Sequence, residues 1–365
     1  MNMAALVTKV LGRCSLPRLN NFEPTNISRQ LTRFASVKAA VLHELCGQLK
    51  VENVERKKKL EKNEVRVKVH TCGLNVSDYL VTRGEYDVKP KLPFIPGHEV
   101  AGKIIEVGSG VSKEFGVGSR VLALSKKEFG GLSEEVVVAQ SDLWTIPTTI
   151  SYQTAAALAD NYSTVLIGLG RRAKIKENDV LLIGAGSGGL GLAALDFAAN
   201  VYKAKAIVIC SSEERAAALR EKGAWSALTY NDKGIINKVK EVTDGKGVQV
   251  VFDALGGPVF ETAVKCVAHE GKVVVAGHAI RQAPPIKVAE VLPQSFSIMG
   301  VSLRNYLVAD YETYRQAVQD ALDMCEQELI NPYVSQVLKL SEVNKGFKKL
   351  EDTNCPGKVL IEMDD

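Results

Sequence analysis

The stretch Val180-Leu-Leu-Ile-Gly-Ala-Gly-Ser-Gly-Gly-Leu-Gly-Leu-Ala-Ala-Leu195 decides the fold, because an apolar strand-like run leads through glycines into a helix-like pattern. Gly186, Gly188 and Gly191 have the G-x-G-x-x-G spacing. Glycine there permits a tight turn, close approach of the backbone to a pyrophosphate, and close packing of helix on strand. The helix N-terminus would then offer free N–H groups to phosphates. The spacing alone also fits a glycine-rich turn without a ligand, so the flanking strand and helix carry the prediction of a dinucleotide site.

Strand-like and helix-like segments alternate after this loop. Residues 206–210, 248–252 and 272–276 are short apolar runs, and residues 211–223 have a helical pattern. Such alternation predicts an α/β fold with a doubly wound parallel sheet, whose ligands bind beyond the carboxyl ends of the strands. The candidate cofactor-binding residues at these ends are Gly186, Ser187, Gly188, Gly189, Leu190, Gly191, Ser211, Ser212, Leu255, Gly277 and His278.

The end of the second strand of this unit indicates which cofactor binds. NAD sites place an acidic residue there to hold the ribose 2′-OH, whereas this chain has Ser211 and Ser212, with Arg215 one helical turn further on. Arg215 could pair with a 2′-phosphate, so we expect NADPH. Two alternatives stay open. Ser211 and Glu214 fit a capping box, which would leave Arg215 as a solvated helix residue, and Glu213 could accept from a ribose hydroxyl.

Length and composition set further limits. The chain has 365 residues, enough for two domains, and 46% of them are hydrophobic and 24% charged. No apolar run approaches bilayer-spanning length. Seven scattered cysteines without a C-x-x-C pair argue against a disulfide framework or a structural zinc site. The net charge of +4 resides in residues 1–36, so the neutral remainder gives no electrostatic case for nucleic-acid binding.

Residues 1–36 are basic, almost free of acidic residues, and contain many hydroxyl and leucine residues. This composition is typical of a mitochondrial transit peptide. We therefore expect a protein of the mitochondrial matrix whose mature chain begins near residues 34–37. A disordered tail is the alternative.

The region before the glycine loop has the pattern of a small β-barrel-like domain. Turns separate its expected strands, which are residues 37–42, 50–54, 64–70, 101–107, 120–123 and 132–139. A helix is expected from residue 151, and the last part of the chain predicts a helix near 313–328 and a closing strand at 358–363.

Several segments together resemble the medium-chain dehydrogenase/reductase superfamily. They are Lys38-Ala-Ala-Val-Leu42, the run 65–78 that ends in Cys72-Gly-Leu-Asn-Val-Ser-Asp78, Pro96-Gly-His-Glu-Val-Ala-Gly102, Gly116-Val-Gly-Ser-Arg-Val121, the glycine loop, Asp253-Ala-Leu-Gly-Gly257 and Gly357-Lys-Val-Leu-Ile361. The resemblance covers residues 37–365 in family order. It implies a GroES-like catalytic domain of β-barrel type at 37–160 and 302–365, split around a Rossmann domain at 161–301.

Within this superfamily the chain is similar to the zinc-free quinone oxidoreductase branch. Zinc-dependent alcohol dehydrogenases carry a cysteine ligand where this chain has Asn75, a histidine matching His98, and often a cysteine near Asp160. Neutral asparagine is a poor zinc ligand, and residues 124–134 contain no cysteine for a structural zinc lobe. We therefore expect no metal, while His98 and Asp160 keep a metal site open as an alternative.

The resemblance also implies roles for residues of the cleft. Residues matching Asn75 and Asp78 face the nicotinamide, and Tyr230 matches a tyrosine near the adenosine phosphate. Tyr86 matches a cleft tyrosine that is the proposed proton donor in related enoyl thioester reductases, although it could instead pack a loop. The glycine loop is one residue longer than the usual family form, which leaves the placement of its residues on the pyrophosphate open.

These features predict an NADPH-dependent oxidoreductase that transfers hydride to a quinone or an activated alkene (enal or enone), with Asn75 and Tyr86 as catalytic residues. The alternatives are a mitochondrial enoyl thioester reductase and an NADPH-binding protein with vestigial activity. We also expect a homodimer, because the apolar run 296–303 would form the last strand of the Rossmann sheet. An edge strand leaves N–H and C=O groups open to a second copy.

Overall fold

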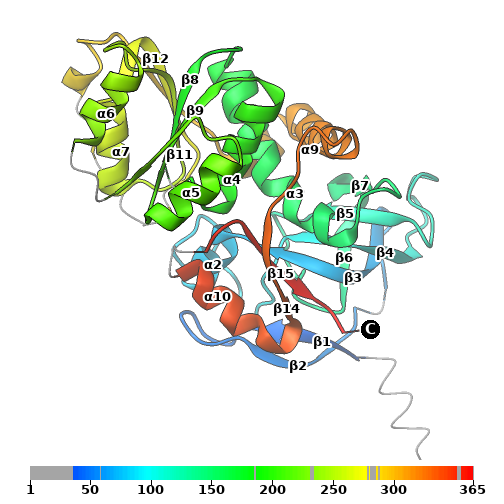
Figure 1. Cartoon of the computed structure of the whole chain (residues 1–365). Coiled ribbons are helices and arrows are strands. Elements are labelled where there is room, and N and C mark those ends of the chain that lie inside the picture. Colours follow the sequence, from blue (N-terminus) through cyan, green and yellow to red (C-terminus); the bar gives the residue numbers. More distant parts are fainter. Residues whose placement is uncertain are drawn as a thin grey trace, which may run out of the picture.

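The computed structural model describes residues 36–57, 59–184, 186–230, 234–277, 279, 285–286, 288–351 and 355–364. They form two domains that meet at a helical junction (Figure 1). Residues 1–35, which hold nearly all of the expected transit peptide, and His278 lie outside the described residues. The presequence and the cofactor contact of His278 therefore stay predictions. No helix in the described part of the chain is long and apolar enough to cross a bilayer.

The dinucleotide-type domain is built on one parallel sheet. Its strands are β8 (Val180–Ile183), β9 (Lys205–Cys210), β10 (Ser226–Thr229), β11 (Val248–Asp253), β12 (Val267–Val275) and β13 (Ser297–Gly300). They run in the order β10-β9-β8-β11-β12-β13, and every neighbouring pair is parallel. The order reverses at β8, which puts a ligand crevice beyond the carboxyl ends of β8 and β11. The predicted doubly wound sheet is confirmed.

Helices cover both faces of this sheet, which explains why its strands are apolar without alternation. The helices that follow the strands are α4 (Gly189–Asp196), α5 (Glu213–Glu221), α6 (Ile235–Val242) and α7 (Gly257–Val264). Leu182 of β8 packs in a core with Val239 of α6 and Phe260 of α7. Leu181, on the opposite face, packs in the larger core that contains Ala194 of α4.

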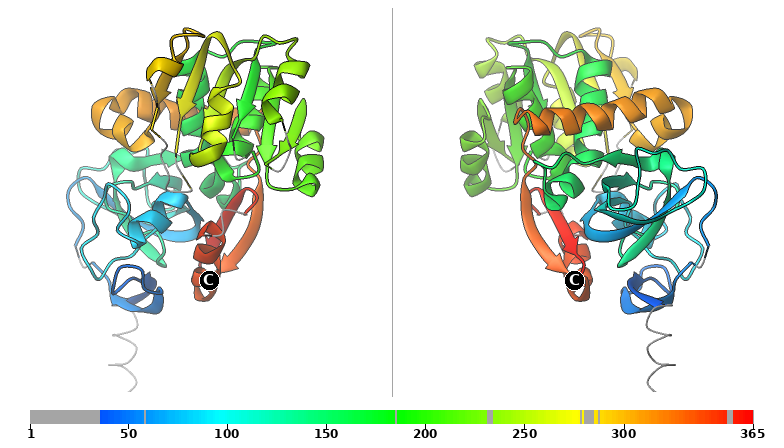
Figure 2. Two further views of the ribbon diagram at one scale, coloured as in Figure 1. Left: turned by 90° about the vertical axis from the view of Figure 1, so that its left-hand side faces the viewer. Right: turned by 90° about the vertical axis from the view of Figure 1, so that its right-hand side faces the viewer.

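The other domain combines the first and last parts of the chain in a mostly antiparallel seven-stranded sheet, beside which its first two strands form a separate two-stranded sheet. Its elements are β1 (Ser36–Val41), β2 (Lys50–Glu55), β3 (Glu64–Leu74), α2 (Val76–Thr82), β4 (Glu99–Val107), β5 (Arg120–Leu124), β6 (Glu135–Ala139), β7 (Leu143–Thr145), β14 (Val334–Lys339), α10 (Val343–Glu351) and β15 (Lys358–Glu362). β15 pairs antiparallel with β3, and β14 pairs with β15. Figure 2 shows these C-terminal strands beside the N-terminal domain. This is the return that the resemblance implies, although the exact domain boundaries stay predictions.

Two helices join the domains into one body. α3 (Tyr152–Val165) and α9 (Tyr311–Glu326) contribute to a core that runs from Leu122 and Trp144 of the first sheet into the Rossmann domain. Hydrogen bonds support this packing: Trp144 Nε1 donates to the Arg315 carbonyl at 3.2 Å, and Tyr314 Oη donates to the Leu124 carbonyl at 3.1 Å. The shared core fixes the two walls of the space between the domains.

The structure corrects the expected strand 296–303. β13 ends at Gly300, and α8 (Leu303–Ala309) follows almost at once. The Ser302 hydroxyl caps that helix by accepting from the Asn305 N–H at 3.3 Å. A serine that can satisfy a free helix N–H favours helix initiation over strand continuation.

Candidate active-site cleft

A cleft of about 1110 Å³ lies between the two domains. Both domains contribute to its walls. The predicted site residues that line it are Asn75, Tyr86, Ser187, Gly188, Gly189, Leu190, Gly191, Ser211, Arg215, Tyr230, Leu255 and Gly277. Asp78, Gly186 and Ser212 are not part of this lining. Asp78 and Ser212 accept from the N–H groups of the lining residues Asn75 and Arg215, and the Gly186 N–H donates to the Ile209 carbonyl of β9. The structure thus brings the adenosine-end and nicotinamide-end candidates to one space, while their contacts with a cofactor stay predictions.

The glycine loop forms a cradle at the start of α4. Gly188 is the N-cap of that helix and provides no side-chain cap, so its first N–H groups face the cleft unobstructed by a side chain. A Cβ on Gly189 would lie 2.7 Å from Asn161 Nδ2, and one on Gly186 would lie 2.8 Å from Val208 Cβ. Gly186 therefore allows close packing of the loop on β9, and Gly189 allows close approach of the start of α4 to Asn161 of α3. These residues fit a pyrophosphate.

The predicted capping box of Ser211 and Glu214 at the end of β9 is wrong by one residue. Ser212, not Ser211, is the N-cap of α5, and its hydroxyl accepts from the Arg215 N–H at 3.4 Å. The Ser211 side chain is thereby left to line the cleft. Glu213, the acidic alternative for a ribose contact, instead pairs with Arg220 at 2.7 Å.

Arg215 gives this end of the cleft a positive charge. Its Nη1 donates to the Ser187 hydroxyl at 3.3 Å, which holds the guanidinium next to the glycine loop. Tyr230 lines the same end. A guanidinium and hydroxyl groups favour a phosphate ester over a ribose 2′-OH, which an acidic residue would hold.

At the opposite end, Asn75 belongs to a buried group that sequence analysis missed. Lys358 Nζ donates to Asn75 Oδ1 and to Glu99 Oε2, both at 2.6 Å. Asn75 Nδ2 donates to the same Glu99 oxygen at 2.9 Å, and Asp78 Oδ2 accepts from the Asn75 N–H at 2.9 Å. These bonds fix the Asn75 amide at the cleft wall. Its predicted action on an acceptor stays a prediction, because the oxygen and nitrogen of the amide already have partners.

A second buried group adjoins the first. His98 Nδ1 lies 2.8 Å from Asp78 Oδ1, and His98 Nε2 lies 3.2 Å from Lys126 Nζ. The Lys126 ammonium also donates to Asp160, whose second oxygen lies 3.5 Å from His98 Nε2. Lys126, Asp160 and Tyr86 line the cleft together. Sequence analysis missed Lys126, since no motif contains it.

Charge pairing outweighs burial in this second group. Burial opposes ionisation of Lys126, but the neighbouring Asp160 carboxylate raises the pKa of Lys126. Burial likewise opposes ionisation of Asp160, and Lys126 and His98 together lower the pKa of Asp160. For His98, burial favours the neutral ring, but Asp78 and Asp160 raise its pKa. Lys126 is thus a stable cation at neutral pH.

These residues do not fit a zinc ion. The ammonium of Lys126 stands between His98 Nε2 and Asp160, where a metal would need both as ligands. The Asn75 oxygen is already bonded to Lys358. Among the described residues, no group of three or more His, Cys, Asp or Glu side chains has the arrangement of a metal site. The donor set and the resident cation therefore argue against the metal alternative.

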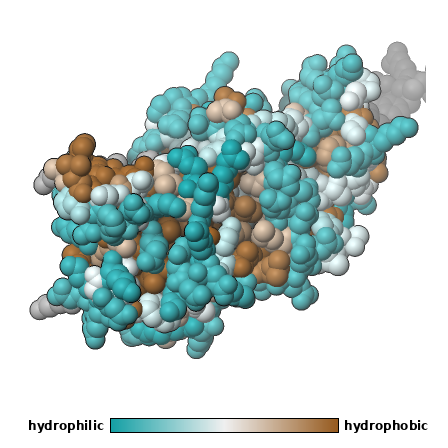
Figure 3. All heavy atoms as spheres, turned by 90° about the horizontal axis from the view of Figure 1, so that it is seen from above, coloured by the Kyte–Doolittle hydropathy of each residue, from teal (hydrophilic) through white to brown (hydrophobic). Residues whose placement is uncertain are grey.

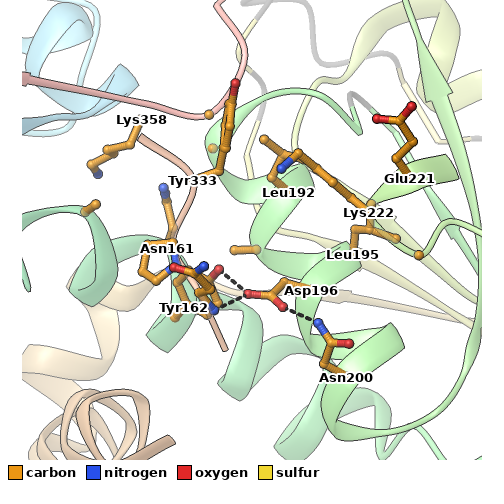
Figure 4. A pocket seen from close by; sticks show the side chains of 17 residues that line it. Asn161, Tyr162, Leu192, Leu195, Asp196, Asn200, Glu221, Lys222, Tyr333 and Lys358 are labelled. Carbon is orange, nitrogen blue, oxygen red and sulfur yellow. Dashed lines mark hydrogen bonds between the residues drawn. The ribbon is translucent and has the colours of Figure 1, made fainter. Parts of the chain in front are cut away.

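A second cavity, of about 400 Å³, adjoins the cleft and shares Asn161, Gly189, Gly357 and Lys358 with its lining. Asp196, which lines this cavity, is hydrogen-bonded to other residues of its wall, as Figure 4 shows. This carboxylate accepts from Tyr162 Oη at 2.6 Å and from Asn200 Nδ2 at 2.7 Å. Lys222 Nζ lies 4.1 Å from the centroid of the Tyr333 ring. This cavity offers a ligand fewer uncommitted groups than the cleft does.

Two family models match the chain. Residues 61–148 match the alcohol dehydrogenase GroES-like domain, and residues 189–323 match the zinc-binding dehydrogenase family. The chain is 37% identical over 327 residues to a quinone oxidoreductase-like protein 2 homolog of Nematostella vectensis, covering 89% of each chain.

Solved structures with the same fold include a quinone oxidoreductase of Pseudomonas syringae, with a TM-score of 0.82 and 27% identity over 89% of this chain and 99% of that one. A mycobacterial protein solved in complex with NADPH has a TM-score of 0.82 and 25% identity, covering 90% of this chain and 100% of the other.

Asp253 at the end of β11 is an incompletely paired acid beside the cleft. Its side chain is buried, and Oδ2 accepts from the Gly256 N–H at 2.9 Å. Oδ1 has no hydrogen-bond partner in the part of the chain that the structure describes. Burial raises the pKa of Asp253 to about 6, against the backbone hydrogen bonds that lower it.

We expect Asp253→Asn to increase stability near neutral pH and to flatten its pH dependence between about pH 4 and 6. In that window the folded chain keeps the Asp253 proton while the unfolded chain loses it, so the free energy of unfolding falls as pH rises. The gain at pH 7 should be on the order of 1–3 kcal/mol, measured by urea unfolding across pH. Asp244→Asn, at an exposed acid, is the control. An unchanged pH dependence in D253N would contradict this account.

Proposed function

We propose that this chain, which belongs to the quinone oxidoreductase branch of the medium-chain dehydrogenase/reductase superfamily, uses NADPH to reduce a quinone or an activated alkene. The observation that carries the proposal is the shared cleft. One end has a glycine loop and a guanidinium for a phosphorylated nucleotide. The other end has a phenol, an ammonium and a buried polar wall, which suit an acceptor that gains negative charge.

The cofactor assignment rests on the residues at the nucleotide end. The glycine loop and the start of α4 would hold the pyrophosphate. Arg215 and Ser211 would hold a 2′-phosphate, and Tyr230 would lie near the adenosine. The mycobacterial relative with NADPH supports the same choice.

The residues at the other end suit proton delivery. When bound, NADPH supplies a hydride and is left as NADP⁺, so the acceptor needs one proton to complete its reduction. Burial raises the pKa of Tyr86, so its phenol stays protonated at neutral pH. Tyr86 would donate that proton to the acceptor and regain one from solvent.

A steady-state screen with NADPH tests the activity. We expect turnover of quinones, enals or enones. The loss of NADPH absorbance over time measures it. Turnover restricted to enoyl thioesters would make the chain an enoyl thioester reductase instead. Tight NADPH binding with no turnover of any of these acceptors would show a vestigial enzyme.

We expect Arg215→Ala to weaken NADPH binding and to leave NADH binding unchanged. The loss of a charge-assisted hydrogen bond to phosphate should cost about 1–3 kcal/mol, or roughly 10- to 100-fold in affinity. Fluorescence titration with both cofactors measures this. Arg220→Ala is a matched control, because Arg220 lies on the same helix but pairs with Glu213. Equal affinities of the wild type for NADPH and NADH would overturn the cofactor assignment.

We also propose that the protein is a homodimer formed through the Rossmann domain. β13 pairs only with β12 among the described strands, so its outer edge is open to another chain. The segment between these strands exposes Val288 and Leu292, which are 79% and 76% accessible. Exposed apolar side chains gather at one end of the molecule in the view from above (Figure 3). A two-fold contact there would bury them and extend the sheet across both copies.

Val288→Asp is expected to shift the protein toward monomer, because a charge would be desolvated in that interface. Light scattering at protein concentrations on the order of 10 μM gives the mass directly. Val117→Asp, at a residue that is 67% exposed in the other domain, should leave the dimer intact. A wild-type monomer at this concentration, or a dimer unaffected by V288D, would contradict the proposed interface.

A further inference from the structure

We propose that Lys126 is a catalytic residue whose ammonium donates a hydrogen bond to the acceptor oxygen on which negative charge develops. This inference rests on the proposed reductase function. It adds a charged donor that neither the sequence motifs nor the resemblance assigns, at the end of the cleft where the acceptor would bind.

The backbone places Lys126 directly after β5. The Ser125 N–H donates to the His98 carbonyl at 2.7 Å, and the Phe129 N–H donates to the Ser125 carbonyl at 3.0 Å. The first bond holds the segment against the residue that precedes β4, and the second closes a turn within the segment. The Lys126 side chain is buried in the protein, where the residue is only 5% exposed, and Lys126 is one of the residues that line the cleft.

The surrounding side chains orient the ammonium. His98 is fixed by Asp78 at Nδ1, so its other nitrogen faces Lys126 Nζ at 3.2 Å. Asp160 accepts from the same ammonium. An ammonium has three hydrogens, and these two partners can take at most two of them. At least one hydrogen remains for a ligand in the cleft.

The chemistry of the acceptor requires such a donor. When a hydride adds to the carbon of an enone or to a quinone, the electrons of the reduced π bond move to the acceptor oxygen. A preorganised cation stabilises that oxyanion more strongly than water does in a buried site. Lys126 keeps its own proton in this step, and Tyr86 supplies the proton that completes the product.

Tyr86 lies within the electrostatic reach of Lys126, and both line the cleft. A cation and a proton donor therefore lie near each other at the acceptor end of the cleft. Asp160 and Glu99 are the acids that face Lys126, and His98 is the titratable base beside it. Their charges hold the ammonium in place, since a buried cation without such partners would be costly.

The first test measures binding rather than turnover. 4-Nitrophenol is an analogue of the oxyanion, because its phenolate carries negative charge on the phenolic oxygen, shared by resonance with the nitro group, and absorbs visible light. Wild-type protein saturated with NADP⁺ should bind the phenolate in preference to the phenol, which lowers the apparent pKa of the bound probe. Lys126→Met should weaken phenolate binding by about 10- to 100-fold.

Matched variants separate the charge of Lys126 from other effects. Lys349→Met makes the same change at an exposed lysine of the same cleft, so phenolate binding should change by less than about twofold. Lys126→Arg keeps the charge and should retain part of the binding. NADPH affinity, measured in parallel, shows whether each variant is folded. If K126M does not fold, the double variant K126M/D160N takes its place in the test. It removes both charges of the buried pair, so that neither is left unpaired.

Turnover provides the second readout. In K126M, kcat/KM for the best quinone or enone should fall by roughly 10²- to 10³-fold, as for other oxyanion donors. Unchanged phenolate binding in a K126M protein that still binds NADPH would overturn the role of Lys126 and leave the reductase proposal standing. Phenolate binding that depends on Lys126, in a wild type that reduces no acceptor, would instead overturn the reductase proposal.

Discussion

A buried charge pair between the first and last parts of the chain holds the acceptor end of the cleft together. Lys358 Nζ lies 2.6 Å from Glu99 Oε2, and neither residue is more than 3% exposed. Glu99 uses its other oxygen to accept from the Asp160 N–H at 2.9 Å. One carboxylate therefore ties β4 to β15 and to α3. Removal of either charge would leave the other buried and unpaired, which is strongly unfavourable.

The C-terminal segment also supports the nucleotide end. The Gly357 N–H donates to the Ser187 carbonyl at 2.9 Å, which joins the segment before β15 to the glycine loop. Gly357 has a φ of +66°, a backbone conformation that a residue with a Cβ rarely adopts. The adjacent residues Gly357 and Lys358 thus contact the glycine loop and the buried Glu99, respectively. The two ends of the cleft are positioned by the same short piece of chain.

The sequence predicts the nucleotide half well and the acceptor half poorly, for a physical reason. The glycine loop, β8 and α4 are consecutive, so local spacing reveals both the fold and the candidate binding atoms. Lys126 is followed by Lys127, and two adjacent lysines in a loop are usually solvated. Tertiary contacts with His98 and Asp160, which are distant in sequence, accompany the burial of the first of them. Likewise, 259 positions separate Glu99 from Lys358, and no periodicity connects them.

The return of β15 to β3 has a consequence for biosynthesis. Translation releases β3 and β4 early, whereas β15 emerges only after all the strands of the Rossmann domain. Until then, β3 lacks one of its neighbours and Glu99 lacks its cation. The strands of the Rossmann domain, by contrast, follow one another without a gap and can assemble while the ribosome is still at work. The GroES-like domain therefore begins to be synthesised first but completes its fold after the Rossmann domain. Until β15 is available, the open edge of β3 is what a nascent-chain chaperone would have to shield.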